Sequence, residues 1–558
     1  MKTSLPLVAL SLLLTGLNAL KPLHVDDTTY CSFARQFAAR PLDPYGHTLL
    51  YFSDPLPALK VLAPPVLPAW WALGIRLFGE RPVLWKLWLF PFVLSFVASL
   101  ATLLRRFAPS SAMPLLLMTV LSPVFLPSLN LMIDVPALAL VLASLALFFR
   151  SSDRNSLTLA LFAGAIAGLA MQTKYTGVLA PVVVLVYSTL FHRLRLGAAA
   201  TAAAALVFCS WEFFLILRYG QSHFLYHLTH SPSTIEVKLS LFPCLFPILG
   251  AVVPSLSLLA LLVGRASGRT LLLAVFLAVL PYLPIGWYDP VLVDFGYDYL
   301  PLTGTLFPIA GVAVVSCLGL SAWRLLHPRQ GEPMLPAFST QGRTAWFLIL
   351  WVVLELCGYF VLSPFAAVRR IMGFTVASTL FLGYYAEQYP MENRPKRLLT
   401  SLVTATILLG FGYWVVDFVE ARAEQQAAYR ALDRIREEDA NAVVWYAGYW
   451  GFQFYAEEVG MKQAVPLLDD ESAQLLPPSQ LHRGDWLVVP DEAIPQQSLD
   501  LDERDMKFQD TLSIDDEVPL RTLIYYYSGT PPLRHRRGSR LDVRLYRIKR
   551  DCIARLPR

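Results

Sequence analysis

The stretch that decides the fold class is residues 83–104, VLWKLWLFPFVLSFVASLATLL, which is followed directly by Arg105 and Arg106. It carries one charge, Lys86 near its start. A run of about 20 apolar residues is long enough to cross the hydrocarbon core of a bilayer as a helix. We therefore predict a membrane-spanning helix here, with its basic end at one membrane surface.

Similar apolar runs recur through the first three quarters of the chain. Hydrophobic residues make up 55% of the 558 residues and charged residues only 16%, against about 25% charged in an ordinary soluble protein. The sequence predicts an α-helical integral membrane protein with about 13 transmembrane helices. These are expected at 4–20, 83–104, 112–129, 135–149, 156–172, 176–192, 198–217, 241–263, 270–288, 300–321, 345–363, 370–386 and 398–418.

Basic residues predict the orientation. Placing the N-terminus inside puts a basic cluster after every even-numbered span, as the positive-inside rule requires. The exterior loop 21–82 then lies outside with the C-terminal end of the chain. Since 24 of the 41 acidic residues follow position 419, we predict a transmembrane domain over 1–419 and a soluble exterior domain over 420–558. The first run ends in Leu17-Asn18-Ala19, which also fits a cleaved signal peptide, but we predict a retained span.

Three acidic residues are expected on the outer face. Asp26 and Asp27 follow the first span, and adjacent acids at a membrane boundary are costly unless they are solvated or used. Asp134 lies between two spans joined by very few residues, where a carboxylate meets little bulk water. The alternatives are a solvated loop end for Asp26 and Asp27, and a helix N-cap before Val135-Pro136 for Asp134.

Cations are expected beside these acids. Lys174 lies between two spans with almost no loop, where it either binds a lipid phosphate or extends to the interface. Arg369 and Arg370 form an exterior basic pair that breaks the positive-inside pattern, which favours a phosphate role. The exterior loop also contains Lys60, and its apolar tail 66–79 is suited to lie in the membrane interface.

Metal ligation has weaker support in the sequence. His223, His227 and His230 share one helical face, but no flanking carboxylate completes a metal signature. The six cysteines show neither CxxC nor Cys/His spacing, and buried free thiols are the expected outcome. We predict no metal site, although clustered carboxylates leave a divalent metal possible.

The order of these motifs resembles a known family. Three motifs are similar to those of bacterial protein-mannosyltransferase-like glycosyltransferases. They are the acid pair after the first span, the Pro64-Pro65 stretch ending in Leu77-Phe78-Gly79-Glu80, and Met132-Ile133-Asp134-Val135-Pro136. These are relatives of the enzyme that adds aminoarabinose to lipid A, within the C-type glycosyltransferase fold. Lys174-Tyr175-Thr176-Gly177 resembles the family's segment before the sixth span. The resemblance covers roughly residues 1–400.

The resemblance implies roles for individual residues. Asp26 corresponds to the catalytic base, Asp27 to its partner acid and Asp134 to the acid of the second exterior loop. The family often has Lys or His directly before Pro-Pro; here Ala63 occupies that place and Lys60 lies three residues earlier. The other residues expected to bind substrate or phosphate are Lys60, Lys174, Tyr175, Arg369, Arg370 and His227.

The C-terminal region also resembles the exterior domain of some bacterial members. Alternating apolar and polar residues over Val444–Tyr455, and then over 483–490 and 521–528, predict strands of a small α/β domain.

The expected function is glycosyl transfer from a polyprenyl-phosphate sugar to an acceptor hydroxyl at the outer face of an inner (plasma) membrane, by inverting displacement. The acceptor is a glycolipid, a polymer or a protein, and neither a nucleotide sugar nor nucleic acid is expected. The alternatives are a secondary transporter or flippase-like protein and a nonenzymatic membrane scaffold. Transporters place ionisable groups within the membrane, and the predicted spans contain few of these, chiefly Glu212 and Glu355.

Overall fold

The computed structural model describes most of the chain. The described residues are 4–51, 54–230, 234–280, 301–328, 339–389, 396–470, 474–491, 499, 504–515, 518–522, 526–527, 531–535 and 538–555. The predicted span 270–288 therefore lies partly outside them, as does half of 521–528.

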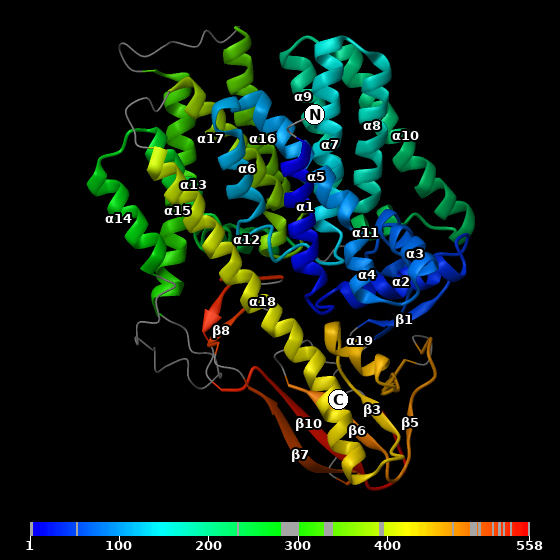
Figure 1. Cartoon of the computed structure of the whole chain (residues 1–558). Helices are drawn as coiled ribbons and strands as arrows, with labels where there is room; N and C mark the ends of the chain where they lie inside the picture. The colour runs from blue at the N-terminus through cyan, green and yellow to red at the C-terminus, as the bar shows by residue number, and fades with distance from the viewer. Residues whose placement is uncertain are drawn as a thin grey trace.

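A bundle of apolar helices forms the larger part of the molecule (Figure 1). Its helices are α1 (Ser4–Ala19), α5 (Phe90–Phe107), α6 (Ala112–Val120), α7 (Asp134–Arg154), α8 (Leu157–Thr173), α9 (Leu179–Leu190), α10 (Leu194–Tyr219), α12 (Ile235–Val252), α13 (Pro254–Val263), α14 (Gly268–Val279), α15 (Pro301–Leu326), α16 (Thr340–Leu362), α17 (Met372–Gln388) and α18 (Lys396–Glu438). Within the described residues, 7 segments are long and apolar enough to cross a membrane, and several shorter apolar helices accompany them. The predicted class, a helical polytopic membrane protein, is confirmed, while the count of about 13 spans stays a prediction.

Proline divides two of the predicted spans. The span predicted at 112–129 is helical only to Val120, and buried turns containing Pro123 and Pro127 lead from there to α7. The span predicted at 241–263 divides at Val253, because Pro254 begins a new helix, α13. Proline has no N–H to donate and clashes with the preceding turn, so it starts helices more readily than it continues them.

Close helix contacts depend on glycine. α12 and α15 cross where Gly250 faces Gly311. A Cβ on Gly250 would lie 1.8 Å from the Phe307 carbonyl oxygen, and one on Gly311 would lie 1.9 Å from that of Phe246. Only a residue without a side chain lets the two backbones approach this closely.

The segment between α1 and α5 forms a compact layer at one end of the bundle (Figure 1). It contains α2 (Asp27–Ala39), the β1–β2 hairpin (Thr48–Tyr51 and Asp54–Pro57), the short helix η1 (Ala58–Lys60), α3 (Val66–Phe78) and α4 (Pro82–Leu87). α3 buries Leu67 and Trp71 but leaves Leu77 57% exposed. This amphipathic character agrees with the predicted interfacial helix.

A small sheet follows at the same end. Its strand order is β4-β3-β6-β10-β7, from Lys462–Gln463, Val444–Tyr446, Trp486–Pro490, Leu541–Ile548 and Met506–Ile514. β3 is parallel to β4 and β6, whereas β10 is antiparallel to β6 and β7. α18 runs unbroken from the bundle to this sheet (Figure 1), so the predicted domain boundary at 419/420 lies within a helix.

The strand predictions are right in part. β6 confirms the strand at 483–490. In Val444–Tyr455 only the first three residues form a strand, and α19 (Trp450–Glu458) follows. The prediction of strand over the second half is wrong. The buried residues are the consecutive runs 450–452 and 454–456, which do not follow the period of two of a half-buried strand. Of the described residues in 521–528, Arg521 belongs to the short strand β8 (Leu520–Arg521), Thr522 is irregular, and Tyr526-Tyr527 are helical.

Candidate active site

Two acidic residues from separate segments meet around one arginine. Asp26 lies at the N-terminal end of α2, Asp134 is the first residue of α7, and Arg369 belongs to the short helix η6 (Val368–Arg370). The Arg369 Nη1 atom donates to Asp26 Oδ2 at 2.9 Å and lies 4.0 Å from Asp134 Oδ2. Lys174, at the C-terminal end of α8, donates to Asp134 Oδ1.

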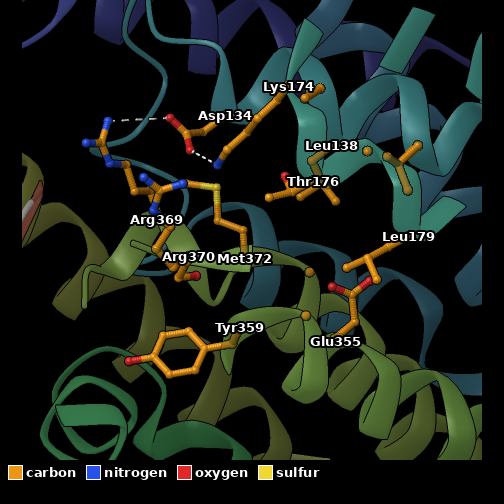
Figure 2. Close-up of a pocket in the computed structure, with 16 residues that line it drawn as sticks. Asp134, Leu138, Lys174, Thr176, Leu179, Glu355, Tyr359, Arg369, Arg370 and Met372 are labelled. Carbon is orange, nitrogen blue, oxygen red and sulfur yellow. Dashed lines mark hydrogen bonds and ion pairs between the residues drawn. The ribbon is translucent and has the colours of Figure 1, made fainter. Parts of the chain in front are cut away.

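The contacts of Asp134 distinguish between the two roles considered for it. The N-cap residue of α7 is Ile133, and Asp134 is the first residue within the helix. Its carboxylate lies between Lys174 and Arg369 (Figure 2). Lys174 is directed toward Asp134, and its side chain is only 13% exposed, so it is an interior ion-pair partner.

The site has more positive than negative charge. Asp26 and Asp134 face Lys174, Arg369 and Arg370. Arg370 stacks on Phe365 with 4.8 Å from its Cζ atom to the ring centroid, and among the described residues it has no carboxylate within ion-pair distance. One cation is therefore left without a matching anion.

Burial and neighbouring charges set the protonation of these cations. Burial is the main cause that lowers the pKa of Lys174 to about 8, with Asp134 opposing it. Burial and then the Arg369 charge lower the pKa of Arg370 to about 10. Burial also acts against the charge of Arg369, but Asp26 and Asp134 outweigh it and raise that pKa. All three are predominantly cationic at neutral pH.

A cavity of about 70 Å³ lies beside these groups. Its polar lining contains Asp134, Lys174, Glu355, Arg369 and Arg370. Figure 2 shows the charged groups on one side and Glu355 of α16 apart from them. The remaining lining includes Leu138, Val141, Leu179, Tyr359 and Met372. The cavity thus joins a cationic end to apolar helix faces, which suits an anionic head group attached to an apolar chain.

Tyrosines surround Asp26 on its other sides. Burial raises the pKa values of Tyr30, Tyr51 and Tyr449, and the Asp26 charge contributes to each rise. Tyr51 of β1 and Tyr449 before α19 meet edge to face, with ring centroids 5.6 Å apart. Phenolic rings beside a carboxylate can contact both the faces and the hydroxyls of a sugar.

Asp27 faces away from this site. It is fully buried, and its Oδ2 atom accepts from the His24 backbone N–H at 3.2 Å. Burial raises its pKa to about 6, with the charges of Lys86, His24 and Lys21 opposing the rise. The two adjacent acids, for which sequence resemblance implies a joint catalytic role, therefore occupy different surroundings.

The other predicted substrate-binding residues lie apart from the two acids. Tyr175 bonds His223 Nδ1 and packs on Phe224 of α11 (His223–Thr229). Burial lowers the pKa of His227 to about 4, which leaves it neutral at pH 7. Lys60 is exposed at the end of η1 and makes no ion pair within the part of the chain that the structure describes.

Two groups of residues were missed as site components. Glu355 was noted only as a charge within a predicted span, yet it lines the cavity; an ionisable residue in a span is itself a signal. The second group comprises Lys21, His24, Lys86, Asp417 and Glu424, which form a buried network next to Asp27. Their positions at span ends gave no sign of mutual contact.

A metal centre has no ready set of ligands here. Over the described ranges, no three His, Cys, Asp or Glu side chains gather closely enough to hold an ion. The six cysteines are free thiols.

Comparison with known proteins completes the description. Residues 63–213 match the family model described as dolichyl-phosphate-mannose-protein mannosyltransferase. No curated protein matches the sequence. Among solved structures, the oligosaccharyltransferase of Archaeoglobus fulgidus in complex with Zn and sulfate is 11% identical with a TM-score of 0.46, over 82% of this chain and 62% of that one. This chain thus spans less than two thirds of that protein.

A second solved structure is ArnT from Cupriavidus metallidurans bound to undecaprenyl phosphate. It is 16% identical with a TM-score of 0.43, over 88% of this chain and 93% of that one. The family-model match, over residues 63–213, confirms the sequence resemblance to the protein-mannosyltransferase-like, C-type glycosyltransferases.

Proposed function

We propose that the protein transfers a glycosyl group from a polyprenyl-phosphate sugar to an acceptor hydroxyl, at the outer face of the cell inner membrane. The observation that carries the proposal is the convergence of Asp26 and Asp134 on Arg369, beside a cavity that Lys174 and Arg370 also line. This convergence supports a base at Asp26 next to ligands for a phosphate. The 1–419 region holds this site, and the 420–558 region is the exterior domain.

The phosphate of the donor occupies the cationic end of the cavity. Arg370 is the first ligand, since it has no carboxylate partner among the described residues, and Lys174 and Arg369 complete the set. Arginine matches the planar, bidentate geometry of phosphate oxygens. The apolar helix faces of the same cavity receive the start of the polyprenyl chain.

Asp26 acts as the general base. As the acceptor oxygen attacks the anomeric carbon, Asp26 takes its proton, and the bond from that carbon to the phosphate oxygen breaks with its electron pair left on the phosphate. Cations already in position stabilise that charge in the transition state. Single displacement inverts the anomeric configuration. Asp134 holds Lys174 and Arg369 in place, and Tyr30 and Tyr51 contact the sugar.

The positive charge required by this chemistry comes from side chains. Arg369 already bridges the two carboxylates that a divalent metal would otherwise join. We therefore propose that no metal cofactor is required, and that activity survives EDTA treatment of washed membranes.

The decisive experiment is a glycosyl-incorporation assay on membranes supplied with a panel of polyprenyl-phosphate sugars and acceptors. Asp26→Asn is expected to lower the rate by about 10²- to 10⁴-fold, the usual contribution of a general base. Asp43→Asn is the matched control, because Asp43 lies in the same exterior loop but pairs with Arg218 at 3.2 Å. Equal rates in wild type and Asp26→Asn would overturn the assignment.

A transporter or flippase remains the alternative, and Glu355 is the observation in its favour because it lies within a membrane helix and lines the cavity. Counterflow of labelled lipid-linked sugar in proteoliposomes, without product formation, would support that alternative.

A further inference from the structure

The segment that leads from α1 to Asp26 is fixed from several sides at once. Lys21 Nζ donates to Asp417 Oδ2 and to the Pro127 carbonyl oxygen, both at 2.6 Å. Lys86 Nζ donates to the carbonyl oxygens of Lys21 and Pro22 at 2.5 and 2.9 Å. Both lysine side chains are buried, so water does not compete for these contacts.

The same segment is held by residues from the C-terminal part of the chain. The Leu23 backbone N–H donates to the Tyr455 hydroxyl of α19 at 2.8 Å. His24 lies between Asp417 and Glu424 of α18, at 3.2 and 3.6 Å. The Tyr527 hydroxyl donates to Asp417 Oδ2 at 3.0 Å, and its ring meets His24 edge to face.

The residue before Asp26 has a strained backbone. Val25 has a φ of +53°, a region that β-branched residues avoid because Cβ crowds the backbone. Such a conformation is unfavourable and persists where surrounding contacts over-determine it. The contacts of Lys21, Leu23 and His24 supply that constraint on one side of Val25.

On the other side, the start of α2 is bonded to the segment before α19. Thr28 Oγ1 donates to the Trp450 carbonyl oxygen at 2.6 Å, and Thr29 Oγ1 lies 2.7 Å from the Tyr449 hydroxyl. Asp26 therefore lies between two anchored stretches, and residues after position 416 contribute to both.

We propose that the C-terminal part of the chain positions Asp26, through the hydroxyls of Tyr455 and Tyr527 and the carboxylate of Asp417 acting on residues Lys21–Val25. The proposal rests on the proposed function, in which Asp26 is the base. Tyr455 and Tyr527 are positioning residues, since they act through the segment and touch neither the cavity nor Asp26. The exterior domain then contributes to the active site by positioning Asp26.

The test uses three single-atom changes in the full-length protein. Tyr455→Phe removes the hydroxyl that accepts from the Leu23 backbone N–H, and Tyr527→Phe removes a donor to Asp417, which in turn pairs with Lys21 and His24. Tyr526→Phe is the matched control: Tyr526 is equally buried, but its hydroxyl bonds the Pro123 carbonyl oxygen at 2.6 Å and Ser128, and does not contact Lys21–Asp27.

For Tyr455→Phe and Tyr527→Phe we expect kcat to fall about 10- to 100-fold, the range for small displacements of a catalytic group. The KM for the donor should change by less than about twofold, because the phosphate ligands are not moved. Tyr526→Phe should keep wild-type kcat. Hydrogen–deuterium exchange of the peptide containing Leu23 should be faster in the first two variants only.

A second-site change separates positioning from general loss of structure. Glycine adopts positive φ without strain, so adding Val25→Gly to Tyr455→Phe should recover part of the lost kcat. Equal kcat in the three tyrosine variants, together with unchanged exchange at Leu23, would overturn the proposal. Asp26→Asn in the same assay distinguishes the failures: if it is inactive while the tyrosine variants are not impaired, only the positioning role is wrong.

Discussion

Two neighbouring buried charge clusters in this protein differ in solvent exposure and in the balance of acidic and basic groups. The site cluster comprises Asp26, Asp134, Lys174, Arg369 and Arg370; the clamp cluster comprises Lys21, His24, Asp27, Lys86, Asp417 and Glu424. In the site cluster the side chains of Asp26, Lys174 and Arg369 keep 23, 13 and 12% exposure. In the clamp cluster those of Lys21, His24, Asp417 and Glu424 are at most 1% exposed.

The balance of acidic and basic groups explains the difference in side-chain exposure between the two clusters. The clamp cluster has three basic and three acidic groups, with lysine donors also bonded to backbone carbonyls, whereas the site cluster has one cation in excess and borders a cavity. A buried cluster with equal numbers of acidic and basic groups fixes geometry, and an unbalanced one next to a cavity can bind an anion. Asp26 and Asp27 are adjacent in sequence, yet each belongs to a different cluster.

The largest effect is expected from unbalancing the clamp cluster. Asp417→Asn leaves Lys21 and His24 buried without their main counter-charge, and breaking one side of a buried ion pair costs about 3–5 kcal/mol. We expect a sharp loss of folded protein, measured by the yield of monodisperse protein in detergent and by the thermal midpoint. A thermal midpoint of Asp417→Asn equal to that of wild type would show that water enters this cluster.

The next effect concerns the excess cation of the site cluster. Arg370→Gln removes a charge without a carboxylate partner in the described chain, so stability should hardly change, unlike in Asp417→Asn. Losing a hydrogen bond to a charged group costs about 1.5–3 kcal/mol, which corresponds to roughly 10- to 150-fold in kcat/KM for the lipid-linked donor. Steady-state kinetics together with thermal midpoints provide the check, and an unchanged kcat/KM would contradict a phosphate role.

His24 makes the clamp cluster sensitive to alkaline pH. Burial opposes its charge, but Asp417 and Glu424 raise its pKa to about 9. Because the folded pKa exceeds the ordinary histidine value of 6.5, the stabilisation is complete below pH 6.5 and is lost as pH rises toward 9. Between pH 6.5 and 8 we expect a loss of about 2 kcal/mol, at 1.36 kcal/mol per pKa unit. Thermal midpoints across this range should fall in wild type and vary less in His24→Gln.

Lys174 makes activity depend on pH, and we expect this effect to be smaller than the effect of His24 on stability. With its pKa lowered to about 8, the free enzyme loses this cation above pH 8, and kcat/KM should then fall up to about tenfold per pH unit. Lys174→Arg keeps its charge, so its kcat/KM profile should stay flat to higher pH. Parallel profiles for the two proteins would assign the decline to another group.

Part of the fold and of the site could be predicted from the sequence, and part could not. The apolar runs predicted the bundle, and sidedness predicted that Asp26, Asp134, Lys174, Arg369 and Arg370 share one face. Four of them meet through the ion pairs of Asp134 with Lys174 and of Arg369 with Asp26 and Asp134, and Arg370 lines the same cavity. His227 was grouped with them because it lies in an exterior loop, and Tyr175 because it follows Lys174 in the family-like motif, but contacts within and to α11 hold both side chains elsewhere. The clamp cluster was not foreseen, because Lys21 and Asp417 are 396 positions apart.

The sequence by itself determined the membrane class, the end of the bundle that holds the site, and the residue types available for catalysis, because hydropathy and charge act locally along the chain. Only the tertiary structure decided that Asp26 pairs with Arg369 of the site cluster while Asp27 faces the clamp cluster. That choice depends on the backbone at Val25 and on contacts from α18, α19 and Tyr527, which are remote in sequence and meet only when the chain folds.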